Sequence, residues 1–108
     1  MAQNFRRYTA NDVGTSAATL FTANSYDTVV GISVANITAS AINVSVYIND
    51  ASNDIYLVKD APIPAGSSLQ VLDGGAKFVV QSGDALKVVS DTASSADVWV
   101  SAVDDIST

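Results

Sequence analysis

Every acidic residue of this 108-residue chain is Asp, and the chain contains neither His nor Cys. A nucleophilic Ser or Cys usually needs His as its activating base, so Ser-His-Asp and Cys-His arrangements are excluded. A Ser–Lys pair could use Lys59, Lys77 or Lys87, but no G-x-S-x-G nucleophile motif occurs. We therefore expect a protein that is not an enzyme.

The Asp residues could also serve as paired carboxylates of a glycosidase or as calcium ligands. Most of them adjoin a turn residue or an expected strand end, where Asp is favoured because its side chain caps its own backbone. These residues are Asp27, Asp50, Asp54, Asp60, Asp73, Asp84 and Asp91. Residues 49–54 have oxygen ligands but lack the EF-hand spacing, and Asp104 and Asp105 could add ligands between subunits. We predict solvated turns and no cofactor, with structural calcium as the alternative.

Aromatic residues on expected strands are the next candidates for binding. Tyr47, Tyr56 and Trp99 could offer flat rings to a sugar, but aromatic side chains are also enriched at protein interfaces. We interpret Tyr47 and Trp99 as contacts to a protein partner. A glycan-binding module, assisted by calcium, is the alternative hypothesis.

The N-terminal segment stands apart because it carries Arg6 and Arg7, two of the five basic residues, between Phe5 and Tyr8. Arginine pairs well with carboxylates, and the chain is otherwise acidic. We predict that Phe5, Arg6, Arg7 and Tyr8 contact a partner from an extended arm over residues 1–11, before a β-sandwich domain over residues 12–108. An irregular first strand and a frayed terminus are the other interpretations.

Composition favours strands over helices. Val, Ala, Ser and Thr are abundant, while the strong helix formers Leu, Glu, Lys and Arg are scarce. The net charge of −6 argues against nucleic acid and anionic membranes as partners, because both need clustered Lys or Arg. No apolar run approaches the ~18 residues of a membrane span. A charged fraction of only 15% indicates a surface partly covered by other protein copies.

Segments of alternating polarity, separated by turn residues, predict seven or eight strands. They cover residues 18–22, 26–36, 42–49, 55–59, 68–72, 77–81, 86–90 and 97–103. The prolines of residues 61–66 place that segment outside a sheet, and residues 73–75 are predicted as a tight turn. Strands at this spacing are typical of an all-β, antiparallel β-sandwich, either jelly-roll or Ig-like.

The faces of these strands follow from the alternation. Val30, Ile32 and Val34 are expected on one face of their strand, with Val29, Gly31, Ser33 and Ala35 on the other. In the next strand the inward set is expected to be Ile42, Val44, Val46 and Ile48. In the last strand Val98, Val100 and Ala102 oppose Trp99, Ser101 and Val103.

Six segments in a fixed order carry a family resemblance. They are VVGISVAN (29–36), INVSVYI (42–48), YLVK (56–59), APIPAG (61–66), LQVLDGG (69–75) and GDALKV (83–88). Together they resemble small virion structural proteins and fibre-associated modules of tailed phages, especially large contractile-tailed phages of marine cyanobacteria. The resemblance covers residues 26–106 and implies a β-sandwich that assembles on the particle, without supplying any binding residue.

The resemblance and the composition together lead to one expected function. We expect a non-enzymatic virion protein that decorates the head or joins the neck or tail apparatus. Its partners would be further copies of itself, for instance in a trimer, and other virion proteins, but neither nucleic acid nor a membrane. A glycan-binding module at a fibre tip is the alternative.

Overall fold

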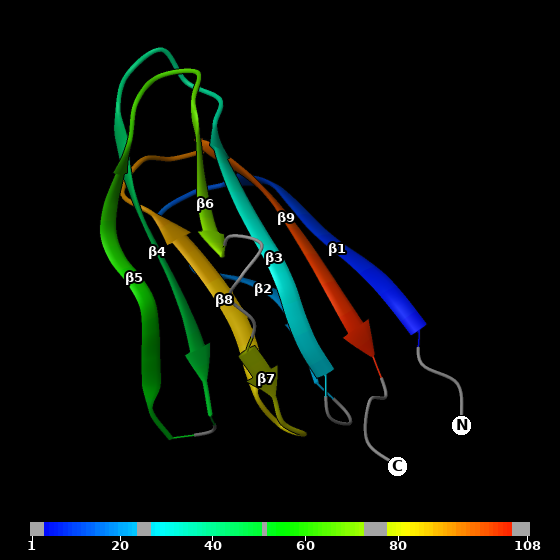
Figure 1. Ribbon diagram of the computed structural model, residues 1–108. Coiled ribbons are helices and arrows are strands. Elements are labelled where there is room, and N and C mark those ends of the chain that lie inside the picture. The colour runs from blue at the N-terminus through cyan, green and yellow to red at the C-terminus, as the bar shows by residue number, and fades with distance from the viewer. Residues whose placement is uncertain (1–3, 24–26, 51, 73–77, 105–108) are drawn as a thin grey trace.

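The computed structural model describes residues 4–23, 27–50, 52–72 and 78–104, and these form two antiparallel sheets packed face to face (Figure 1). Sheet A contains β1 (Asn4–Val13), β9 (Ala96–Asp104), β3 (Asp27–Asn36) and β6 (Ser68–Leu72) in this order, and β7 (Phe78–Val80) also pairs with β3. Sheet B contains β2 (Ala18–Thr22), β8 (Ala85–Ser90), β4 (Ile42–Asn49) and β5 (Asp54–Ile63). The predicted all-β sandwich is confirmed.

The strand order distinguishes between the two predicted topologies. β1 pairs with β9, β2 with β8, β3 with β6 and β7, and β4 with β5, so the chain resembles a long antiparallel hairpin that has been rolled up. The contacts of β9 with β3 and of β8 with β4 close this roll into two sheets. This arrangement is a jelly roll and not the Ig-like alternative.

The core lies between the inner faces of the two sheets. Ile42, Val44 and Val46 of β4 are buried there as predicted, and Ile48 packs against the same core. Val98, Val100 and Ala102 of β9 are also buried, while Trp99 is exposed on the opposite face. Burial therefore alternates strictly along β9, whereas in β4 the predicted outward residues Ser45 and Tyr47 are buried as well.

The face assignment of β3 was wrong at its first residues. Val29 is fully buried, whereas Val30 is half-buried. Val29 pairs with Ala102 of β9, and Gly31 pairs with the adjacent Ser101. Val30 is therefore one extra residue between two consecutive pairs. A β-bulge of this kind resets the alternation by one residue. Ile32 and Val34, beyond the bulge, are buried as predicted.

The prediction that residues 61–66 lie outside a sheet was wrong for residues 61–63. β5 continues to Ile63, and Pro62 pairs with Asn43 of β4. β5 is the edge strand of sheet B and, among the described residues, pairs only with β4. Proline lacks a backbone N–H, and an edge strand tolerates it because one side of the strand has no neighbouring strand to bond. The predicted tight turn at residues 73–75 lies outside the described residues.

The N-terminal segment forms a strand and not a separate arm. Residues 4–13 are β1, which pairs with β9 along sheet A. Tyr8 and Ala10 pack against the core, so the proposed boundary between residues 11 and 12 divides a strand that belongs to the sandwich. The first-strand interpretation is the correct one for the described residues, and residues 1–3 lie outside them. In the described part of the chain, no helix is long and apolar enough to cross a membrane.

Candidate functional site

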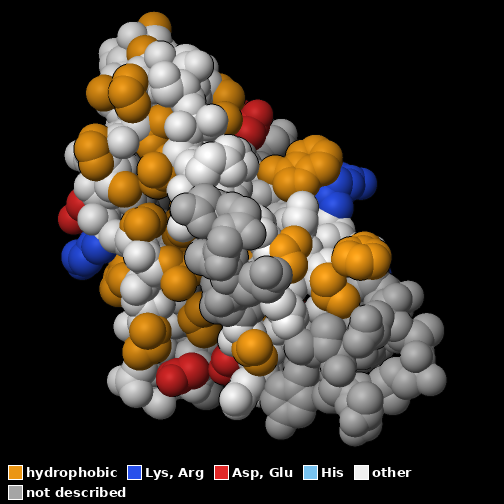
Figure 2. Space-filling model, viewed as in Figure 1, with side chains coloured by type: hydrophobic (Ala, Val, Ile, Leu, Met, Phe, Trp, Pro, Cys, Tyr) orange, Lys and Arg blue, Asp and Glu red, His pale blue; other side chains and the backbone are white. Residues whose placement is uncertain are grey.

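The outer face of sheet A brings together several of the predicted contact residues. Because strand neighbours point to opposite faces, the residues between the buried ones on β1, β9 and β3 share this face. Cross-strand register places Phe5 opposite Val103, and it places Trp99 between Thr9 and Ser33. Figure 2 shows apolar side chains next to Lys or Arg side chains over β9 and β1.

Arg7 and Trp99 form the best-defined contact on this face. The Cζ atom of Arg7 lies 5.4 Å from the centre of the Trp99 ring, a cation–π arrangement. Trp99 is 53% exposed and Phe5 is 85% exposed. The structure therefore leaves two large aromatic side chains in contact with solvent on one sheet face, and Arg7 contacts one of them.

The other two residues of the predicted N-terminal contact set lie apart. Arg6 is exposed on β1. The ring of Tyr8 stacks on that of Phe21, with a centroid distance of 4.3 Å and an interplanar angle of 14°. Phe21 belongs to the buried core, so Tyr8 contributes to the packing of β1 against β2. Its ring is therefore a structural contact within the chain.

Tyr47 is also placed differently from the prediction. It is only 8% exposed, and its ring lies 5.0 Å from that of Tyr56. Burial raises the pKa of the Tyr47 phenol above its ordinary value, and the nearby charge of Asp54 adds to this effect. Tyr56 is 41% exposed and carries the ammonium group of Lys59 at 4.8 Å from its ring centre. On this surface Tyr56, and not Tyr47, is the ring that a partner could touch.

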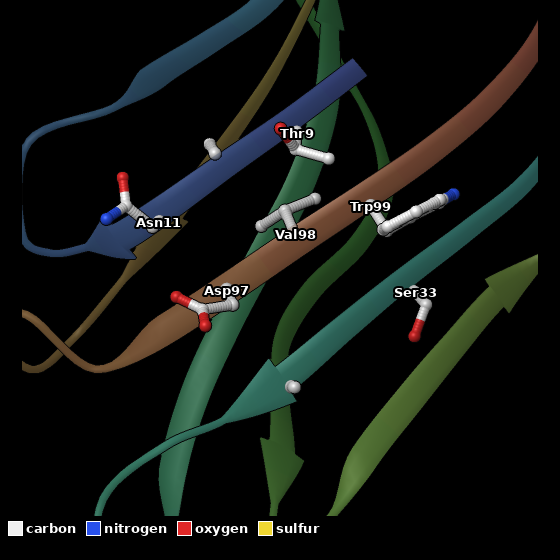
Figure 3. A pocket seen from close by; sticks show the side chains of 8 residues that line it. Thr9, Asn11, Ser33, Asp97, Val98 and Trp99 are labelled. Atoms are coloured by element: carbon white, nitrogen blue, oxygen red, sulfur yellow. The ribbon is translucent and has the colours of Figure 1, made fainter. Parts of the chain in front are cut away.

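A shallow pocket of about 410 Å³ lies on the outer face of sheet A beside Trp99 (Figure 3). Asp97 and Trp99 project from β9 two residues apart, Thr9 and Asn11 come from β1, and Ser33 comes from β3. The other lining residues are Ala10, Ala35 and Val98. Since Ala10 and Val98 face the core, the floor there is formed by strand backbone.

Hydrogen bonds hold part of this pocket in place. The Oδ1 atom of Asp97 accepts a hydrogen bond of 3.1 Å from the backbone N–H of Asp12, a residue with a positive φ of 53°. The Ser33 hydroxyl accepts one of 3.2 Å from Gln70 Nε2. The carboxylate and the hydroxyl are therefore oriented before any ligand arrives.

Asp50 and Asp84 act as the turn caps that the sequence predicted, whereas Asp27 is buried at the start of β3 and Asp60 lies within β5. Asp50 Oδ1 accepts from Asn53 N at 2.9 Å, and Asp84 Oδ2 accepts from Gln81 N at 3.1 Å. The backbone N–H of Asn43, followed by the Thr92 hydroxyl, holds the pKa of Asp91 below its ordinary value. Among the described residues, no three carboxylates gather into a possible metal site. Asp105, one of the suggested calcium ligands, lies outside these residues.

Sequence reasoning missed the polar side of the pocket. Asp97 was detectable, because alternation along β9 places it on the same face as Trp99. Thr9, Asn11 and Ser33 were not, because they reach the pocket through pairings of β1 and β3 with β9. These pairings join distant parts of the chain, and no local pattern specifies them.

Comparison with known proteins adds information on the fold. No family model matches the chain, and no curated protein matches it. A solved structure reported as "Bacillus endospore appendages form a novel family of disulfide-linked pili" is similar, with a TM-score of 0.55 and 13% sequence identity. The match covers 94% of this chain and 84% of that one. The disulfides of that title have no counterpart within this sequence, which contains no Cys.

Proposed function

We propose that this chain is a non-enzymatic structural protein of a tailed-phage virion, and that it assembles with further copies of itself through β1. The observation that carries the assembly is the outer edge of β1, with which no strand of the described residues pairs. The register of β1 with β9 is regular from Asn4 to Ala10. A long, regular free edge is a template for another strand, so a partner is expected to cover it.

The other sheet edges are less suited to strand addition. β5 shifts register twice against β4, contains Pro62 and has Asp60 at a positive φ of 52°. Bulges and prolines of this kind protect an edge from pairing. β2 and β6 have only five residues each. The contrast singles out β1 as the edge available for assembly.

The charge distribution favours a second copy as the occupant. The chain has eleven Asp but only five Lys or Arg, and two of these five, Arg6 and Arg7, are on β1. When two β1 strands pair antiparallel, the Arg6–Arg7 end of each strand lies toward the Asp12 end of the other, so the two copies are complementary in charge along this edge. Such a contact uses the same edge of both copies and closes into a two-fold symmetric oligomer.

The virion location is supported by the ordered sequence segments that resemble phage structural proteins. The jelly roll is also an architecture of viral capsid domains. Head decoration and a neck or tail position are both compatible with a protein that repeats one contact between copies. Other virion proteins would then be further partners.

Size-exclusion chromatography with light scattering tests the assembly. We expect an oligomer for the wild type and a monomer for Phe5→Asp, since a charge would replace the apolar cross-strand contact of Phe5 with the added strand. Ile55→Asp is the matched control, because Ile55 is also exposed, at 55%, but lies on β5. This variant should stay oligomeric. A monomeric wild type, or equal behaviour of both variants, would contradict assembly through β1.

Immunogold labelling tests the location on particles of a phage that encodes this chain. We expect the gold label at one defined position on the head, neck or tail of the particle. Purified particles without label, from a lysate in which the chain is present, would contradict the virion assignment while leaving self-assembly standing.

A further inference from the structure

We propose that the pocket beside Trp99 is a binding site for a neutral pyranose unit of a glycan. The pocket consists of the Trp99 ring together with Asp97, Asn11, Thr9 and Ser33, and it lies on the outer face of sheet A. This site is independent of the assembly proposed above, because a strand added to the edge of β1 extends the sheet and leaves its face open.

The Trp99 ring supplies the apolar wall of the site. Arg7 reaches the ring from the Ser101 side, since Arg7 and Ser101 are cross-strand partners, while the pocket lies toward Asp97. One face of a pyranose carries several C–H groups with partial positive charge. These groups are attracted to the negative face of an aromatic ring, so a sugar can stack where the ring is exposed.

The polar groups around the ring match the hydroxyl edge of a sugar. Asp97 is an acceptor, Asn11 both donates and accepts through its amide, and the hydroxyls of Thr9 and Ser33 can do either. Asp97 Oδ1 accepts a hydrogen bond from the N–H of Asp12, which restricts the orientation of the carboxylate before a ligand binds. Three strands thus supply hydrogen-bonding groups around one aromatic ring.

Size and charge define the class of sugar. A volume of about 410 Å³ has room for one or two pyranose rings. The carboxylate of Asp97 and the net charge of −6 disfavour an acidic sugar. A purely apolar peptide would leave the carboxylate and the amide without partners, which costs binding free energy. A neutral hexose therefore fits the lining best.

Trp99 is the only tryptophan of the chain, so its fluorescence reports on this pocket alone. The experiment titrates the full chain with glucose, galactose, mannose, N-acetylglucosamine and their disaccharides. We expect a saturable emission change for at least one of them, with a Kd of about 1 mM for a single ring, because a small ligand on a shallow site gains little free energy.

Four variants make the titration specific. Asp97→Ala should weaken binding about tenfold or more, and Asn11→Ala severalfold, with unchanged circular dichroism. Tyr56→Ala, which removes an exposed ring on sheet B, should bind like the wild type. Trp99→Ala should abolish binding in ligand-observed NMR, which does not depend on the fluorophore.

The outcomes also separate this site from the assembly. Phe5→Asp should keep sugar binding although it loses the oligomer, and Asn11→Ala should keep the oligomer. The glycan site is refuted if no sugar of the panel gives a saturable change, or if Asp97→Ala and Tyr56→Ala bind alike. It is also refuted if Trp99 emission responds only to protein concentration, because a second copy would then cover this face.

Discussion

Asn36 shows how one buried polar side chain can connect distant parts of the sandwich. It is 2% exposed, and its amide donates to the carbonyl oxygens of Ser40 at 2.8 Å and Ile63 at 3.0 Å. Its Oδ1 accepts from the backbone and hydroxyl of Thr38, both at 2.8 Å. The end of β3, the loop to β4 and the end of β5 are thereby tied together.

Replacing this residue should destabilise the fold markedly. Asn36→Ala leaves several buried polar groups without partners, so the free energy of unfolding should fall by about 3 kcal/mol. Urea denaturation followed by circular dichroism measures the change. Asn43→Ala is the matched control, since the Asn43 side chain bonds Asp91 at an exposed position, and it should cost less than about 1 kcal/mol. Equal losses would show that Asn36 is not a structural anchor.

The roles of individual side chains could be predicted only in part from the sequence. The turn caps Asp50 and Asp84 could be predicted, because Asp prefers such positions for a local reason, but the burial of Asp27 in β3 could not. Among the proposed contact residues, Phe5, Arg6, Arg7 and Trp99 are exposed or meet on sheet A, while Tyr8 and Tyr47 pack against other rings. Whether an aromatic side chain is exposed or packed depends on its neighbours across strands, and sequence spacing does not define these neighbours.

Individual strands were predictable where alternation is uninterrupted. β4 has the predicted bounds, and the inward residues of β9 are those that the pattern indicated. Bulges explain the failures: the one at Val30 reversed the face of Val29, and β5 continues past Asp60 although Pro62 suggested an end. A bulge adds one residue without any fixed sequence signature, so alternation alone could not reveal it.

Asp60 allows a test of the β5 bulge. Its φ of 52° lies in the left-handed region, which a β-branched residue adopts only with strain. Asp60→Val should therefore lower the free energy of unfolding by about 1–2 kcal/mol. Asp60→Gly should be neutral or slightly stabilising, because glycine adopts this φ freely. Thermal and urea unfolding of the two variants provide the comparison, and a Gly variant as damaged as the Val variant would contradict the strain.

At the scale of the whole molecule, the sandwich was predictable but its strand order was not. Many short strands in one domain-sized chain indicate two packed sheets. The jelly roll, however, depends on pairs such as β1 with β9, which join the two ends of the described chain. Such pairings are set by how the complete roll buries its faces, and local patterns do not contain them. This long-range pairing also creates the free edge of β1 and the pocket beside Trp99.

Hydrogen–deuterium exchange of the purified protein, assembled and diluted to the monomer, tests the role of β1 most directly. If a second copy covers this edge, amides within residues 5–10 that point away from β9 should exchange slowly in the assembly and quickly in the monomer. Amides of β5 should exchange alike in both states. Equal exchange of β1 in both states, or protection that appears only on β5, would contradict assembly through the β1 edge.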